Sequence, residues 1–314
     1  MTLALLAALV LDQLCGEPRR WHPLVGFGGV AKTLEARLND GRRRSGVWAL
    51  AIALATPAAC IAALLYGLAS GALWLGWLAA SLLAALAIGY RSLGDHIHAV
   101  RRPLVAGDIK AARAAVARVV SRDCLAMDAP AVRRAALESL LENAADAVFA
   151  SMFWFAVGGL LAGPVGAGTA VVIHRLANTL DAMWGYRTPR LAAFGWAAAR
   201  VDDALNWPVA RLTALVFAVC GSPRTALACW RTQASACASP NAGPVMSAGA
   251  GALRVRLGGG ALYHGAWTPR PTLGCGHAPT DADLDRGLAL IARARLLWLV
   301  VIAVTAGVWG WAWA

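Results

Sequence analysis

The chain has 314 residues, of which 59% are hydrophobic and only 15% are charged, and its formal net charge is +12. Soluble domains carry about 25% charged residues, so this composition excludes an ordinary soluble globule, and its high apolarity excludes a disordered chain. The basic residues are dispersed beside apolar segments. This pattern indicates contact with the lipid bilayer and its anionic headgroups, and not binding of nucleic acid.

The apolar segments predict an all-α polytopic integral membrane protein with a single domain over residues 1–314. A short apolar segment at 1–11 is expected to form a short membrane-embedded helix. Residues 47–90 hold no charged residue and no histidine. These 44 residues would make a helix of about 66 Å, twice a bilayer core of about 30 Å, so we predict two spans. The predicted apolar segments are 1–11, 47–66, 72–90, 147–173, 207–221 and 296–314.

The segment 147–173 differs from the others, because five glycines and one proline crowd its centre. A helix of 27 residues measures about 40 Å, too short for two crossings. A broken helix at membrane depth must be buried in protein or line a cavity, so we predict a re-entrant segment. The charged stretches 12–46, 91–146, 174–211 and 222–295, each with an excess of Lys and Arg, would then form cytoplasmic helices and loops of an inner-membrane protein.

Acidic residues recur at every fourth position ahead of the broken segment. Glu138, Glu142 and Asp146 share one drifting helix face, and Asn143 lies beside them. Such a stripe is commonly a solvated helix face. Asp146, however, abuts the apolar segment, where a carboxylate is costly unless a cation meets it. A functional and a structural interpretation both stay open.

A second polar group follows the broken segment directly. His174, Asn178 and Asp181 fall within roughly 60° of one helix face. Because this face emerges from an apolar stretch, we expect it to line a cavity.

A third group stands just before Pro208, where Asp202 and Asp203 lie near Asn206 at the expected end of a helix. Adjacent carboxylates repel each other, and a divalent cation relieves the repulsion. Hard oxygen ligands of this kind suit Mg²⁺ that bridges to a phosphate. The alternative is that Asp203 pairs with Arg200 and the other residues are solvated. The predicted metal ligands are Asp181, Asp202 and Asp203.

Two loops have the composition of anion-binding segments. Residues 239–243 form a turn sequence, and residues 254–260 place two arginines before three glycines. Arginine supplies forked donors, and glycine lets backbone N–H groups approach an anion. The alternative is a plain turn between two elements, and the residues of these loops alone favour it. The chain has no Walker A sequence, which excludes a standard P-loop ATPase.

An ordered series of motifs covers nearly the whole chain. It comprises Asp12, Gly16-Glu17-Pro18 and His22-Pro23, then Glu142-Asn143 and Asp146, then Asn178-Thr179-Leu180-Asp181 and Gly185-Tyr186, then Arg200, Asp202-Asp203 and Asn206, and finally Ser239-Pro240-Asn241-Ala242-Gly243 and Leu257-Gly258-Gly259. In this order the motifs resemble the adenosylcobinamide-phosphate synthase family of cobalamin biosynthesis. Two positions depart from the family pattern: Met246 stands where the family has an acidic residue, and Ser151 where it has proline.

The resemblance implies a ligase that joins an aminoalcohol, usually aminopropanol phosphate, to the propionate carboxyl of adenosylcobyric acid. ATP and Mg²⁺ are the implied cofactors, with the carboxylate activated as an acyl phosphate before the amine attacks. Such chemistry needs held phosphates, positioning and electrostatic support. The candidate catalytic residues are Glu142, Asp146, Asp181 and Asp202. The candidate substrate- and phosphate-binding residues are Asn143, Asn178, Asn206, Arg200, Arg211, Ser239, Asn241, Arg254, Arg256, Gly258 and Gly259.

We expect the three carboxylate–asparagine groups to converge on one cavity that faces the cytoplasm, and other late enzymes of the cobalamin pathway to be partners. Two other functions remain open. A membrane prenyltransferase also uses paired carboxylates near the membrane, with Mg²⁺ and diphosphate. A transporter for a corrinoid or a metal would account for the broken helix.

Overall fold

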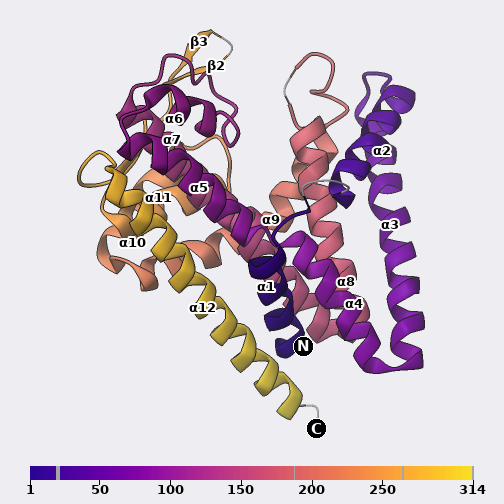
Figure 1. Cartoon of the computed structure of the whole chain (residues 1–314). Coiled ribbons are helices and arrows are strands. Elements are labelled where there is room, and N and C mark those ends of the chain that lie inside the picture. The colour runs from indigo at the N-terminus through magenta and orange to yellow at the C-terminus, as the bar shows by residue number, and fades with distance from the viewer. Residues whose placement is uncertain (19–21, 187, 264, 313–314) are drawn as a thin grey trace. The chain divides into compact units, whose positions relative to one another are not determined.

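The computed structural model describes residues 1–18, 22–186, 188–263 and 265–312 (Figure 1). The helices are α1 (Thr2–Cys15), α2 (Pro23–Leu38), α3 (Arg43–Gly71), α4 (Leu73–Ala87), α5 (Tyr90–Val105), α6 (Ile109–Val116), α7 (Ala129–Asn143), α8 (Ala150–Trp184), α9 (Trp196–Cys220), α10 (Pro223–Gln233), α11 (Ala242–Leu253) and α12 (Asp281–Ala312), with a π-helical turn η1 (Ala144–Phe149) and a 3-10 turn η2 (Ala234–Ala236). The strands, each of three residues, are β1 (Arg256–Gly258), β2 (Ala261–Tyr263), β3 (Ala266–Thr268) and β4 (Thr272–Gly274).

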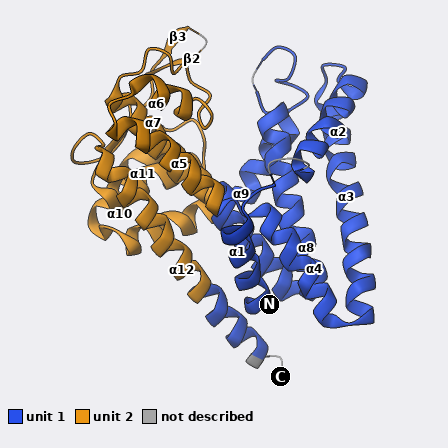
Figure 2. Ribbon diagram, in the orientation of Figure 1, with its two compact units in different colours: residues 1–90, 146–206, 301–314 blue, residues 91–145, 207–300 orange. Residues whose placement is uncertain are grey.

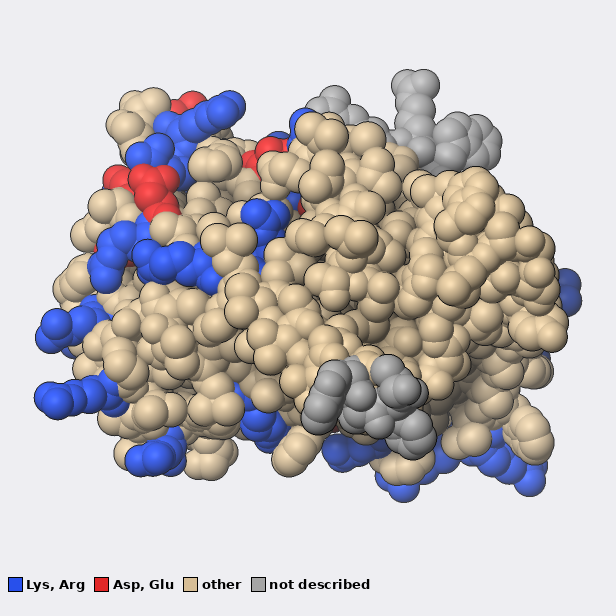
Figure 3. Space-filling model, turned by 90° about the horizontal axis from the view of Figure 1, so that it is seen from below, with Lys and Arg blue, Asp and Glu red and all other residues tan. Residues whose placement is uncertain are grey.

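The predicted all-α polytopic membrane class is confirmed. Among the described residues, 5 helical stretches are long and apolar enough to cross a membrane. They are Arg43–Gly71, Leu73–Val105, Ala129–Trp184, Trp196–Cys220 and Asp281–Gly310. Seen from below, a large part of the molecular surface carries no Lys, Arg, Asp or Glu (Figure 3), as a lipid-facing surface requires.

The chain forms two compact units, whereas the sequence alone predicted one domain (Figure 2). The first unit comprises Met1–Tyr90, Asp146–Asn206 and Val301–Ala314. The second comprises Arg91–Ala145 and Trp207–Val300. Each unit is therefore assembled from segments that are far apart in the sequence.

In the first unit, α8 packs against α3 and α4, and α4 packs against α1. Small residues make these contacts close. Gly168 lies against Ala80 and Leu65, and a side chain at position 168 would collide with Leu65. Apolar helices in a membrane gain little from burying apolar surface and associate through such close backbone approaches.

The predicted break in the segment 147–173 is present inside α8. Ala162 (φ −145°, ψ 31°) and Gly163 (φ 58°, ψ −146°) leave the helical conformation, and Pro164 follows. The two halves then pack on each other. A Cβ on Gly158 would collide with the backbone of Gly166, and a Cβ on Gly166 would collide with the backbone of Gly158. Residues eight apart in a continuous helix would be separated by about 12 Å, so the chain doubles back here.

This hairpin has the geometry that a re-entrant segment needs. The apolar limb 147–161 measures about 22 Å, and the apolar limb 164–173 about 15 Å. Both are shorter than a bilayer core of about 30 Å. The glycines at the crossing let the limbs meet without side chains between them.

The expected helix end before Pro208 is wrong. Residues 196–220 form the continuous helix α9, with Pro208 inside it, so the segment 207–221 is not a separate short element. Proline removes one backbone hydrogen bond, which a membrane helix tolerates where neighbours satisfy the freed groups. The indole Nε1 of Trp154 on α8 donates to the carbonyl oxygen of Leu205 at 3.2 Å, which ties α9 to α8 just before the proline. The polar group before the proline therefore lies within a long helix.

The other predicted segments are present with different bounds. The segment 1–11 extends to Cys15, 47–66 extends to Arg43–Gly71, and 72–90 divides into α4 and the start of α5. The last helix begins at Asp281 and not at 296, while residues 313–314 lie outside the described residues. Helix formation needs only backbone hydrogen bonds, so polar residues at the membrane edge continue helices beyond the apolar window.

The second unit is built around α11, whose residues are all buried. It packs against α7 and α10, and Gly249 and Gly251 leave room for Leu141 and the backbone of Thr225. The predicted loop at 254–260 and the chain after it contain short strands: β1 pairs antiparallel with β4, and β2 with β3.

Candidate functional site

In the first unit, a polar network joins the facing helices α8 and α9. Asp202 Oδ1 accepts hydrogen bonds from the side-chain amides of Asn178 (3.4 Å) and Asn206 (3.0 Å). Asn206 Oδ1 lies 2.9 Å from Nε2 of the buried His174. Since the Asn206 amide nitrogen donates to Asp202, its oxygen must accept, so His174 carries its proton on Nε2. The structure thus brings the second and third polar groups together.

Two further carboxylates stand beside this network. The charges of Asp181 and Asp203 both repel that of Asp202. Asp203 lies 3.7 Å from Arg200, the ion pair that the structural alternative predicts. Asp181 lies against Gly185, where a Cβ would collide with its carboxylate oxygen.

Glycine at position 185 serves a purpose other than a left-handed turn. Gly185 ends α8 with φ −71° and ψ −2°, a conformation that is open to any residue. Its missing side chain leaves space for the carboxylate and for the backbone oxygen of Asp181. The local sequence thus fixes where that carboxylate lies.

The oxygen groups fit a metal–phosphate complex better than an all-protein metal cage. Within the described ranges, no group of three or more His, Cys, Asp or Glu side chains is placed to hold a metal ion. Mg²⁺ bound with phosphates takes only one or two protein carboxylates and completes its shell with phosphate and water oxygens. Asp181 and Asp202 supply that number, while Asp203 already has Arg200 as a partner.

Arg175 is a cation that the sequence analysis did not single out. Its charge interacts favourably with those of Glu17, Asp146 and Asp202. Its buried Nε has no hydrogen-bond partner among the described residues. It is a cation of the kind that Asp146 needs at the edge of the apolar segment. Its position next to His174, at the exit from that segment, was the available signal.

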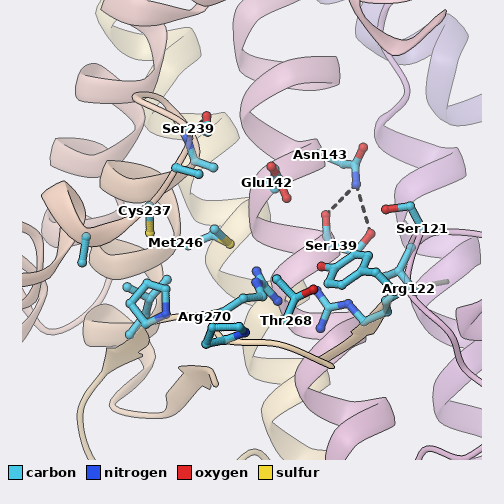
Figure 4. Close-up of a pocket in the computed structure, with 18 of the residues that line it drawn as sticks. Ser121, Arg122, Ser139, Glu142, Asn143, Cys237, Ser239, Met246, Thr268 and Arg270 are labelled. Carbon is cyan, nitrogen blue, oxygen red and sulfur yellow. Dashed lines mark hydrogen bonds between the residues drawn. The ribbon is translucent and has the colours of Figure 1, made fainter. Parts of the chain in front are cut away.

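The second unit contains a cavity of about 610 Å³ (Figure 4). It is lined by the loop that precedes α7, one face of α7, the start of α11 and the strand segment. Its polar lining residues are Ser121, Arg122, Ser139, Glu142, Asn143, Ser239, Tyr263, Thr268 and Arg270. This volume is within the ordinary range of small-molecule sites.

Glu138 is the buried anchor of the cavity wall. Its Oε2 accepts from Arg122 at 2.7 Å and from Arg270 at 2.8 Å, and its Oε1 accepts from the backbone N–H of Gly258 at 2.7 Å. Burial opposes the charged form of Arg270, but the nearby Glu138 carboxylate outweighs it and raises the pKa of Arg270 above its ordinary value. Glu138 therefore ties three other segments to α7.

The glycine-rich segment binds an anion, but that anion belongs to the protein. The N–H of Gly258 donates to Glu138, and the N–H of Gly259 donates to the Pro271 carbonyl at 3.1 Å. Both predicted phosphate donors are thus engaged inside the unit. The side chains of Arg254 and Arg256 are exposed and do not line the cavity.

Glu142 differs from Glu138 one turn earlier on α7. The side chain of Glu142 is exposed, lines the cavity and accepts no hydrogen bond from a described residue. Asn143 beside it donates to the backbone oxygen and hydroxyl of Ser139 at 2.8 and 3.0 Å (Figure 4). Glu142 is thus free to meet a ligand.

The remaining predicted residues of the second unit support its framework. Arg211 donates to Asn241 Oδ1 at 2.9 Å and stacks 4.5 Å over the ring of Trp207. The hydroxyl of Ser239 accepts the N–H of Asn241 (3.3 Å) and of Ala242 (3.1 Å), which caps the start of α11. Ser239 also lines the cavity.

The predicted groups divide between the two units. Asp146, Asn178, Asp181, Arg200, Asp202, Asp203 and Asn206 belong to the first, and Glu142, Asn143, Arg211, Ser239, Asn241, Arg254, Arg256, Gly258 and Gly259 to the second. Convergence of all three carboxylate groups on one cavity stays a prediction. Sequence reasoning missed Arg122 and Arg270. The only signal for Arg270 was its place as the charged residue between two prolines.

Comparison with known proteins identifies the family. The family model described as CobD/Cbib protein matches residues 5–291. Proteins named Cobalamin biosynthesis protein CobD from Stutzerimonas stutzeri and Chromobacterium violaceum are 49% and 50% identical over 306 and 298 residues, covering 96% and 93% of this chain and 96% and 92% of theirs. One with the same name from Mycobacterium tuberculosis is 40% identical over 292 residues, 91% of this chain and 89% of its own. No solved structure matches the chain. The chain belongs to the CobD/Cbib family of cobalamin biosynthesis proteins.

Proposed function

We propose that the protein joins the amine of an aminoalcohol, as aminopropanol phosphate, to a propionate carboxyl of adenosylcobyric acid. The reaction consumes ATP and requires Mg²⁺. A carboxylate is a poor acyl donor, so the carboxyl oxygen first takes the γ-phosphoryl group of ATP and ADP leaves. The amine then attacks the acyl carbon, the C–N bond forms and phosphate departs with the acyl C–O bond broken. The product is adenosylcobinamide phosphate.

The observation that carries this proposal is the Asp202 network between α8 and α9. Asn178 and Asn206 fix one carboxylate oxygen of Asp202 by hydrogen bonds, and Asp181 adds a second, repelling carboxylate. Mg²⁺ held there would offset the charge of the ATP phosphates. Asn178 and Asn206 hold the Asp202 carboxylate in place, and the buried His174 fixes the orientation of Asn206.

Product analysis tests the reaction. Purified protein in lipid nanodiscs receives adenosylcobyric acid, ATP, Mg²⁺ and aminopropanol phosphate, and the corrinoid products are identified by mass spectrometry. We expect adenosylcobinamide phosphate, with one ADP released for each amide and no product when any component is omitted. Corrinoid unchanged in mass in the complete mixture would contradict the proposal.

We also propose that the protein lies in the cell inner membrane with its polar segments in the cytoplasm, where ATP is available. Arg190 tests this orientation because its side chain is largely exposed. An Arg190→Cys variant is treated with a membrane-impermeant maleimide in right-side-out and inverted vesicles, and the modified peptide is identified by mass spectrometry. We expect labelling in inverted vesicles only, and labelling from the periplasmic side would contradict the re-entrant arrangement.

A further inference from the structure

The cavity of the second unit has an unusual balance of charge. Arg122 and Arg270 share the single carboxylate of Glu138, which leaves one surplus positive charge on its wall. Glu142 supplies one negative charge that no described residue pairs with a hydrogen bond. The wall is neutral in total, yet it presents a positive and a negative end to the same space.

The arginines keep donors for a ligand. An arginine has five N–H donors, and each of these two uses one on Glu138. Their guanidinium groups line the cavity together with the hydroxyls of Ser121 and Thr268. Guanidinium and hydroxyl donors are the groups that hold a phosphate.

The carboxylate of Glu142 is the complementary end. It interacts electrostatically with Arg270 and Arg122 across the cavity, and Figure 4 shows it beside Ser139 and Asn143 on α7. Because no protein donor occupies this exposed carboxylate, a ligand ammonium group can donate to it in a charge-assisted hydrogen bond without displacing a protein partner. A ligand with only a phosphate would leave Glu142 unpaired.

We propose that this cavity is the site of the small zwitterionic substrate, with its primary ammonium group on Glu142 and its phosphate on Arg270 and Arg122. The inference rests on the proposed function, since it assigns the aminoalcohol phosphate to a pocket. Glu142 is then the residue that holds the amine, and Glu138 positions the two arginines. The volume of about 610 Å³ leaves room beside such a ligand.

Binding of matched probes tests the assignment. Full-length protein in nanodiscs is titrated calorimetrically, without ATP, with aminopropanol phosphate, with 1-amino-2-propanol, which lacks the phosphate, and with isopropyl phosphate, which lacks the amine. We expect aminopropanol phosphate to bind at least about tenfold more tightly than either fragment, as a charge-assisted hydrogen bond at each end implies. Equal affinity for isopropyl phosphate and aminopropanol phosphate would refute the role of Glu142.

The variant Glu142→Gln isolates the negative end, because it keeps the shape of a side chain whose carboxylate has no described hydrogen-bond partner. We expect it to bind aminopropanol phosphate about tenfold or more weakly and isopropyl phosphate as the wild type does. Asp95→Asn, on an exposed carboxylate in α5, is the matched control and should change neither affinity. Unchanged binding of aminopropanol phosphate to Glu142→Gln, or its competitive displacement by ATP, overturns the assignment.

Cys237 reports on the location of the ligand, because it lines the same cavity (Figure 4). Burial, and the carboxylates of Glu142 and Glu138, raise the pKa of the Cys237 thiol, so alkylation is measured at about pH 8.5, near the ordinary thiol pKa. Aminopropanol phosphate should slow alkylation of Cys237 at least about tenfold when it is saturating and leave the exposed Cys15 unchanged. An unchanged rate at Cys237 overturns the assignment.

The two proposals fail separately. If the probes bind as expected but no amide forms in the complete reaction, the proposed function is wrong while the zwitterion site stands. If adenosylcobinamide phosphate forms but neither Glu142→Gln nor Cys237 protection responds as expected, this assignment alone is wrong.

Discussion

The Asp202 network of the first unit and the cavity of the second use the same residue types in different ways. In the network, Asp202 is hydrogen-bonded by two amides, with no guanidinium hydrogen-bonded to it among the described residues. In the cavity, Glu138 is saturated by two arginines and a backbone N–H, while Glu142 is left open. A buried carboxylate that is fully paired supports the structure, and a carboxylate that is incompletely neutralised, whether buried or exposed, is available for a ligand. The comparison therefore distinguishes the carboxylates that can bind a ligand, Asp202 and Glu142, from Glu138, which stabilises the fold.

The largest effect is expected from the network. Asp202→Ala and Asp181→Ala should each lower amide formation about 100-fold or more, the size of effect seen when a preorganised electrostatic group is removed. Rates are measured by product mass spectrometry at saturating substrates, and size-exclusion profiles check that the protein stays folded. The control Asp95→Asn should react at the wild-type rate. Near-normal turnover in either alanine variant would contradict the metal–phosphate role.

A stability comparison of the two glutamates on α7 sharpens the distinction. Glu138→Gln leaves Arg122 and Arg270 without their carboxylate, and breaking a buried pair costs about 3–5 kcal/mol. Glu142→Gln removes no hydrogen bond from a described residue, so its free energy of unfolding should stay close to that of the wild type. Thermal unfolding in nanodiscs measures both variants. Equal melting temperatures for the two would remove the basis for separating their roles.

The same contrast explains what the sequence predicted. His174 and Asn178 on α8, and Asp202 and Asn206 on α9, are four residues apart on their helices, so helical periodicity alone placed each pair on one face. The break at Gly163 was also predicted, because glycine and proline have strong local effects. These features depend on neighbours along the chain.

What the sequence did not predict depends on distant contacts. Arg122, Glu138, Gly258 and Arg270 meet from four separate segments, and no local pattern encodes that meeting. The glycine-rich segment was predicted to bind a phosphate, and in the structure the N–H of Gly258 donates to the protein's own Glu138. Pro208 was wrongly predicted to end a helix, because a long apolar helix tolerates the loss of one backbone hydrogen bond, and tertiary contacts such as that of Trp154 with Leu205 hold α9 against α8.

The smallest effect concerns the position, not the presence, of a carboxylate. Gly185 has a backbone conformation open to alanine, but a Cβ there would collide with the carboxylate of Asp181 and, less severely, with its backbone oxygen. Gly185→Ala should therefore shift Asp181 and slow amide formation about tenfold, well short of the loss in Asp181→Ala, since a displacement of about 1 Å in a positioned group can cost up to about 100-fold. Gly94→Ala is the matched control, because Gly94 has open space around it and alanine favours its helix.

Rates are compared over a range of Mg²⁺ concentrations. If the displaced carboxylate binds a metal–phosphate complex, higher Mg²⁺ should restore part of the rate in Gly185→Ala. A tenfold loss that Mg²⁺ does not relieve would place Asp181 outside the metal site, and a wild-type rate would mean that its position does not matter to the reaction.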